Sequence, residues 1–152
     1  MNFQRISVIG AGAWGTALAN AAALAGCAVK LWGRDAAEMQ VMVSSRENSK
    51  RLPGVKLHDN VTPVTSLAEA ANADALLLAV PAQTLRQVAQ DLVGSVKAGV
   101  PLIITAKGIE RESGLFLSDV VRAVLPDGVP CVLSGPSFAD DVARGLPTAV
   151  VL

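Results

Sequence analysis

Short apolar, β-branched runs alternate along the chain with alanine-rich stretches that have helical spacing. The apolar runs predict strands at Arg5–Ile9, Ala28–Trp32, Ala75–Val80, Pro101–Thr105, Pro130–Leu133 and Thr148–Leu152, with a weaker one at Val61–Thr65. The stretches between them predict helices at Ala13–Ala25, Ala36–Ser45, Ser66–Ala71, Thr84–Val93, Gly114–Val124 and Ser137–Arg144. Because the strands are apolar at nearly every position, helices should cover both faces of the sheet. We therefore expect an α/β fold, with a doubly wound, mainly parallel sheet in a three-layer α/β/α arrangement.

Length and charge narrow the possible partners. The 152 residues (15.6 kDa) fit one domain, which we take as residues 1–152. Thirteen Lys and Arg balance thirteen Asp and Glu, so no basic surplus favours a nucleic acid. The apolar runs fall short of the roughly 18 residues that a membrane crossing needs, so we expect no membrane insertion.

The ends of the chain and its cysteines bear on location and completeness. The polar start Met1–Arg5 has no apolar leader behind it, and Cys27, Cys131 and the single His58 do not cluster as metal ligands. These features favour a cytoplasmic protein without a bound metal. The apolar run at Thr148–Leu152 has no turn or charged finish after it, which indicates a part of a longer protein.

A glycine-rich turn follows the first strand. It reads Gly10-Ala11-Gly12-Ala13-Trp14-Gly15 and opens a predicted helix, which is the context of a dinucleotide-binding fingerprint. Gly10 permits a tight turn, Gly12 lets a pyrophosphate approach the backbone, and Gly15 lets helix and strand pack closely. Gly26 suits the end of the helix. A turn that serves packing alone is the alternative, but we predict a Rossmann-type NAD(P)-binding domain.

The end of the second strand indicates which dinucleotide is bound. Gly33 and Arg34 fit an NADP site, where a small residue and a nearby arginine accommodate the 2′-phosphate. Asp35 is either a displaced ribose-binding acid or the N-cap of the next helix, with Glu38 at its third position, and we favour the cap. We expect NADP(H) to be preferred, with NAD(H) still possible.

Polar groups at other strand ends indicate a second ligand, because ligands of open parallel sheets bind beyond the carboxyl ends of the strands. Pro81 lies where a nicotinamide ribose would pass, although it can equally be a strand terminator. Lys107 projects from a turn, either over the crevice or into solvent. Ser137 lies in a segment, Ser134–Ala139, that opens a helix, and its hydroxyl either receives a phosphate or caps that helix. Together these groups favour a small phosphorylated substrate.

These segments together resemble the N-terminal domain of bacterial-type NAD(P)-dependent glycerol-3-phosphate dehydrogenase. The resemblance covers essentially the whole chain and rests on VIGAGAWGTALA from Val8, LWGRD from Leu31, LPG from Leu52, AKGIE from Ala106, LSGPSFA from Leu133 and GLPTA from Gly145. It implies reduction of dihydroxyacetone phosphate to sn-glycerol 3-phosphate, a precursor of membrane phospholipids, and leaves a homodimer open. It implies cofactor contacts at Ala13, Trp14, Arg34 and Ala139, and substrate contacts at Lys107, Gly135 and Ser137.

The resemblance also implies what this chain lacks. The proton-transferring lysine of the family belongs to a C-terminal helical domain, and nothing here matches it, so we expect cofactor binding without turnover. Lys107 would help only by its charge, near the oxygen where negative charge develops. Arg51 and His58 depart from an aromatic residue and a proline of the family; His58 is either a catalytic acid or, as we favour, an exposed polar group.

Two other functions stay open from sequence. A ketopantoate-type or related β-hydroxyacid dehydrogenase shares the glycine turn and the arginine, but the Ser134–Ala139 segment argues against it. A stand-alone NADP-binding regulatory module would bind the cofactor and do no chemistry. Fold analogy alone does not separate these functions.

Overall fold

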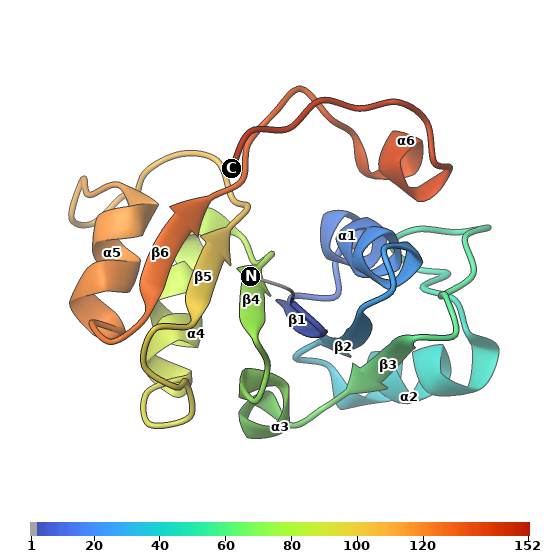
Figure 1. Ribbon diagram of the computed structural model, residues 1–152, viewed down its shortest axis with the longest axis horizontal. Helices are drawn as coiled ribbons and strands as arrows, with labels where there is room; N and C mark the ends of the chain where they lie inside the picture. The colour runs from blue at the N-terminus through green and yellow to red at the C-terminus, as the bar shows by residue number, and fades with distance from the viewer. Residues whose placement is uncertain (1–2) are drawn as a thin grey trace.

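The computed structural model describes residues 3–152 and shows a parallel sheet between two layers of helices (Figure 1). Its six strands follow the order β3-β2-β1-β4-β5-β6, and every neighbouring pair is parallel. The strands are β1 (Arg5–Ile9), β2 (Ala28–Trp32), β3 (Val61–Val64), β4 (Ala75–Leu78), β5 (Pro101–Ile104) and β6 (Val129–Val132). The doubly wound α/β fold is confirmed.

The helices alternate with the strands along the chain. They are α1 (Ala13–Leu24), α2 (Ala36–Ser45), α3 (Leu67–Ala71), α4 (Leu85–Asp91), α5 (Leu117–Val124) and α6 (Ala139–Ala143), with a short 3-10 helix, η1 (Ala82–Thr84), before α4. The chain leaves β3 at one edge of the sheet and crosses through α3 to β4, beside β1 in the centre. This reversal of strand order opens a crevice at the ends of β1 and β4, where ligands of such sheets bind.

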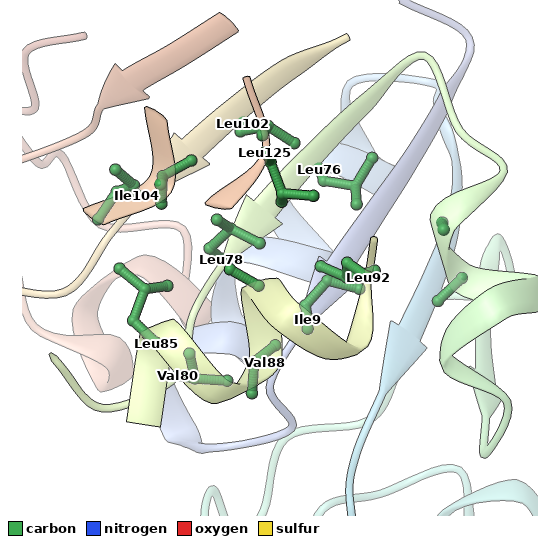
Figure 2. Packing of buried hydrophobic residues seen from close by; sticks show 14 of the residues in the cluster. Ile9, Leu76, Leu78, Val80, Leu85, Val88, Leu92, Leu102, Ile104 and Leu125 are labelled. Carbon is green, nitrogen blue, oxygen red and sulfur yellow. The ribbon is translucent and has the colours of Figure 1, made fainter. Parts of the chain in front are cut away.

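Each face of the sheet carries its own core. Val8, Leu31 and Leu77 face α1 and α2, where they pack with Met39 and Met42. On the other face Ile9, Leu76, Leu78, Leu102 and Ile104 pack with apolar residues of α4 and α5, as Figure 2 shows. Because helices cover both faces of the sheet, successive residues along a strand are apolar and not only every second one, as the sequence indicated.

The C-terminal region differs from the prediction. Thr148–Leu152 is not a strand of the sheet: it is exposed, and only Val151 pairs, in an antiparallel bridge with Ser134. Figure 1 shows this segment running alongside the chain that leaves β6, with α6 beside α1. The prediction was wrong because an apolar, β-branched run becomes a strand only where it pairs along a neighbouring strand, and the chain returns this run to Ser134, beyond the end of β6, and not to the free edge of β6.

Two further observations concern the chain as a whole. Within residues 3–152, none of the helices is long and apolar enough to cross a membrane. The prediction that no leader precedes the first strand depends partly on Met1 and Asn2, which lie outside the described residues.

Candidate functional site

A cleft of about 1320 Å³ runs along the carboxyl ends of four strands. Its walls are the connections that follow β1, β2, β4 and β5, together with part of the connection between α2 and β3. Nearly all cofactor-binding residues predicted from sequence line it: Gly10, Gly12, Ala13, Trp14, Gly15, Arg34, Pro81 and Lys107. Their roles remain predictions, but the fold brings them together.

Two glycines of the first turn are required by close packing. Gly10 has φ +123°, and a Cβ there would lie 2.4 Å from the carbonyl oxygen of Ala79. A Cβ on Gly15 would lie 1.9 Å from the carbonyl oxygen of Gly10. Any side chain at either position would push helix α1 away from β1 and β4, so the tight-turn and close-packing interpretations of these residues are supported.

Gly12 is different, because its surroundings are open. No atom lies within 4 Å of a Cβ built on it, and it lines the cleft. It is the N-cap of α1, with extended backbone and no side-chain capping bond, and the first turn of the helix holds no acidic residue. The N–H groups of Ala13, Trp14 and Gly15 have no acceptor within the helix, and the helix dipole is positive here. Free donors beside open space fit a pyrophosphate group.

The connection after β2 carries two charged residues, Arg34 and Asp35, and only the Asp35 side chain has a hydrogen-bond partner within residues 3–152. Asp35 Oδ1 accepts hydrogen bonds from Ala37 N (2.9 Å) and Glu38 N (3.1 Å), so the N-cap interpretation is confirmed. Arg34 is exposed, lines the cleft and makes no side-chain hydrogen bond or ion pair with residues 3–152. A Cβ on Gly33 would lie 2.4 Å from Met39 Sδ, which gives this glycine a packing role that the sequence did not reveal.

Sequence reasoning missed the contribution of the long α2–β3 connection. Lys50 and Arg51 line the cleft, and Lys50 Nζ is paired with a carboxylate oxygen of Glu38, which also lines it. Charged residues in a loop without periodicity carry no signal that separates them from solvated surface residues. Their place follows from a buried asparagine in the same loop, Asn48, which bonds to the glycine-rich turn.

A second cavity of about 370 Å³ adjoins the cleft. Trp14, Thr105 and Lys107 line both cavities. The second is completed by residues that follow β6, which are Leu133, Ser134, Gly135, Ser137, Phe138 and Ala139. Lys107 Nζ donates to the carbonyl oxygen of Gly135 at 3.0 Å, so the predicted substrate residues adjoin one another and Lys107 stands between the two cavities.

Hydrogen bonds and an ion pair from residues of η1 and α4 fix the loop that carries Lys107. The Gln83 carboxamide donates to Ile109 O (2.9 Å) and accepts from Arg111 N (3.0 Å). Arg86 donates two hydrogen bonds to the carboxylate of Glu110, and the Arg86 guanidinium, with help from the Ser113 hydroxyl, lowers the pKa of Glu110 to about 2. Lys107 therefore projects from a braced loop.

Ser137 does not cap helix α6, which was one of the two roles that the sequence allowed for it. Helix α6 starts at Ala139 after an N-cap at Phe138, which makes no side-chain capping bond, and the Ser137 hydroxyl donates to Ala149 O at 2.9 Å. The predicted helix Ser137–Arg144 shortens to five residues because the chain before it stays extended against residues 149–151. A Cβ on Gly135 would lie 2.2 Å from Ala149 O, so this contact also requires glycine.

His58 lies outside both cavities. It is half-buried, its Nδ1 accepts from Asn60 N at 3.1 Å, and its own N–H donates to Asn20 Oδ1 at 3.0 Å. These contacts give His58 a structural role in the α2–β3 connection, and its side chain does not line the cleft.

The chain matches the family described as NAD-dependent glycerol-3-phosphate dehydrogenase N-terminus over residues 5–152. It is 59% identical over 150 residues to glycerol-3-phosphate dehydrogenase (NAD(P)+) of Azorhizobium caulinodans, covering 99% of this chain and 46% of that protein. The enzyme of the same name from Bradyrhizobium is 53% identical, with the same coverage. The chain thus spans about half the length of the curated relatives it matches.

Solved structures agree on the fold. A crystal structure of glycerol-3-phosphate dehydrogenase from Coxiella burnetii superposes with a TM-score of 0.90 at 31% identity, covering 97% of this chain and 45% of that one. A ketopantoate reductase from Ralstonia eutropha superposes with a TM-score of 0.67 at 17% identity, covering 86% of this chain and 41% of that one. At that identity the likeness to ketopantoate reductase is one of fold only.

Proposed function

The chain belongs to the family of NAD-dependent glycerol-3-phosphate dehydrogenase N-termini, and on this premise we propose that it is the NADP(H)-binding half of an enzyme that reduces dihydroxyacetone phosphate to sn-glycerol 3-phosphate. The observation that carries the proposal is the pair of adjoining cavities with Lys107 in the wall of both. One cavity has the size and donors for a dinucleotide, and the other suits a small anion.

The proposed cofactor residues each have a physical task. The free N–H groups of Ala13 and Trp14 bind the pyrophosphate, with Gly12 leaving room for it. Arg34 binds the 2′-phosphate, which would make NADP(H) the preferred cofactor and NAD(H) the weaker one. Pro81 lines the first cavity and Ala139 the second, and Lys107 lines both, so we place the nicotinamide end where the two cavities adjoin. A bound nicotinamide cofactor supplies the hydride.

The proposed substrate residues surround the second cavity. The Lys107 ammonium group lowers the barrier by stabilising the negative charge that develops on the ketone oxygen, or holds the substrate phosphate. The Ser137 hydroxyl and the backbone at Gly135 complete the contacts. Lys107 already uses one donor on Gly135 O, so it is oriented before any substrate binds.

The remaining chemistry lies beyond these residues. We assign proton transfer to a C-terminal helical domain, because the chain covers 46% of its A. caulinodans relative and because Lys50, the other lysine that lines the cavities within residues 3–152, is paired with Glu38. We also propose a cytoplasmic enzyme that supplies a phospholipid precursor, in a full-length form that can be a homodimer.

Binding and turnover, measured separately, test the proposal. The chain of 152 residues should bind NADPH in a fluorescence or calorimetric titration and should not reduce dihydroxyacetone phosphate. The same chain extended by its natural downstream residues should oxidise NADPH when dihydroxyacetone phosphate is added. No NADPH binding by the chain, or appreciable turnover without the extension, would contradict the proposal.

A further inference from the structure

Arg51 lines the same cleft as Arg34, although the two residues come from different connections of the chain. We propose that Arg51 is a second residue that binds the 2′-phosphate of NADP(H), and so a determinant of cofactor choice. This inference rests on the proposed function of the cleft, and it assigns a ligand to a loop that the sequence did not connect with binding.

The backbone that carries Arg51 is fixed against the glycine-rich turn. Asn48 is buried, and its Nδ2 donates to Ala11 O at 3.0 Å and to Thr16 Oγ1 at 2.8 Å. The N–H groups of Arg51 and Leu52 both donate to Asn48 O, at 3.2 and 2.8 Å, and the Leu52 side chain is buried. Arg51 therefore projects from a backbone position set by the turn that would hold the pyrophosphate.

The carboxylates at this end of the cleft are already engaged. Asp35 caps α2 through Ala37 N and Glu38 N, and Glu38 is paired with Lys50. A ribose 2′-hydroxyl is bound best by a free carboxylate acceptor, as in NAD sites. With both acids occupied, this end of the cleft lacks the group that would favour NAD(H).

The guanidinium groups, in contrast, are free. Neither Arg34 nor Arg51 makes a side-chain hydrogen bond or ion pair with another residue in the described part of the chain, and both are exposed in the wall of the cleft. A phosphate with about two negative charges accepts charge-assisted hydrogen bonds from both guanidinium groups. The pyrophosphate already has backbone donors at α1, which leaves the 2′-phosphate as the partner for Arg51.

The test compares NADPH and NADH binding to four variants of this chain. Arg51→Gln should weaken NADPH binding about tenfold, the size of one charge-assisted contact, and change NADH binding less than twofold. Arg51→Lys should recover part of the NADPH affinity, and Arg34→Gln should act in the same direction as Arg51→Gln. Arg122→Gln, an exposed arginine on α5 paired with Asp119, is the matched control and should change neither affinity.

The outcomes separate this inference from the proposed function. If Arg51→Gln loses the same affinity for NADPH as for NADH, Arg51 contacts a group that both cofactors share. If it loses no affinity, Arg34 alone determines the preference for NADPH. Either result overturns the inference, while the proposal that the cleft binds a cofactor stands. If the unsubstituted chain binds neither nucleotide, the proposed function itself fails. Inhibition of NADPH binding by adenosine 2′-monophosphate, weakened in Arg51→Gln and unchanged in Arg122→Gln, checks the assignment by an independent probe.

Discussion

Arg86 and Glu110 form a two-armed ion pair in which Arg86 Nε donates to Oε1 at 2.8 Å and a terminal guanidinium nitrogen donates to Oε2 at 2.7 Å. The pair joins α4, which follows β4, to the loop that follows β5. Because Pro81 lies in the connection after β4 and Lys107 in the loop after β5, the ion pair fixes two walls of the cleft relative to each other.

The ion pair predicts how stability depends on pH. Glu110 has its pKa lowered from 4.5 to about 2 by Arg86 and Ser113. A carboxyl group whose folded-state pKa is lowered stabilises the fold above its unfolded pKa, and this contribution is lost as pH falls through the folded value. We expect Glu110→Gln to lower the free energy of unfolding at pH 7, and the gap to the unsubstituted chain to shrink between pH 4.5 and pH 2.

Urea unfolding at a series of pH values measures this gap. Glu69→Gln is the control, because Glu69 is also paired, with Lys30, but its side chain is 52% exposed. A gap for Glu110→Gln that stays constant down to pH 2 would show that the lost stability comes from packing and not from the charge.

Arg34 gives a prediction about cofactor preference. If its guanidinium binds a 2′-phosphate, Arg34→Ala should remove about 1.5 to 3 kcal/mol from NADPH binding, roughly a ten- to hundredfold loss, and leave NADH binding nearly unchanged. Fluorescence titration with each nucleotide measures both affinities. An unchanged NADPH-to-NADH ratio in the variant would refute the assignment of Arg34.

The local structure of the glycine-rich turn was predicted correctly from sequence because its requirements are local. Strand, turn and helix are continuous in the chain, and the bounds of β1 and β2 agree with the predicted ranges. Arg51 and Asn48 could not be read in this way, because their place depends on contacts between the α2–β3 connection and a turn more than thirty residues earlier. The conformation of Thr148–Leu152 was non-local in the same sense, since it depended on where the chain after α6 returns relative to β6.

Two glycines of the turn should respond differently to the same substitution. Gly12 has φ −76° and open space around its Cβ position, so Gly12→Ala should fold with a stability within about 1 kcal/mol of the unsubstituted chain. The added methyl group occupies the approach to the helix N-terminus, so NADPH binding should weaken by roughly tenfold or more. Gly15→Ala should instead destabilise the fold by about 1 to 3 kcal/mol, because its Cβ would meet Gly10 O.

Thermal unfolding and NADPH titration of both variants separate the two effects. The prediction fails if Gly12→Ala unfolds as readily as Gly15→Ala, or if it binds NADPH as well as the unsubstituted chain. The contrast matters because it distinguishes a glycine kept for a ligand from one kept for packing.

Two buried asparagines attach the α2–β3 connection to α1 and the glycine-rich turn, at different distances along the chain from Arg51. Asn48 bonds to Ala11 O and Thr16 Oγ1, whereas Asn20 donates to Lys56 O and accepts from His58 N. Replacing either with alanine removes two hydrogen bonds made by a buried side chain, which should cost about 1 to 3 kcal/mol in each case. The two variants should therefore lose similar stability.

Cofactor binding should distinguish them. In Asn48→Ala the segment that carries Arg51 loses its attachment to the turn, so NADPH affinity should fall and the preference over NADH should narrow, because the arginine is no longer held in place before binding. In Asn20→Ala the attachment at Ala11 and Thr16 persists, so the preference should be kept at temperatures where the variant is folded. Equal NADPH-to-NADH ratios in the two variants would mean that Asn48 supports the fold alone, and that the position of Arg51 does not depend on it.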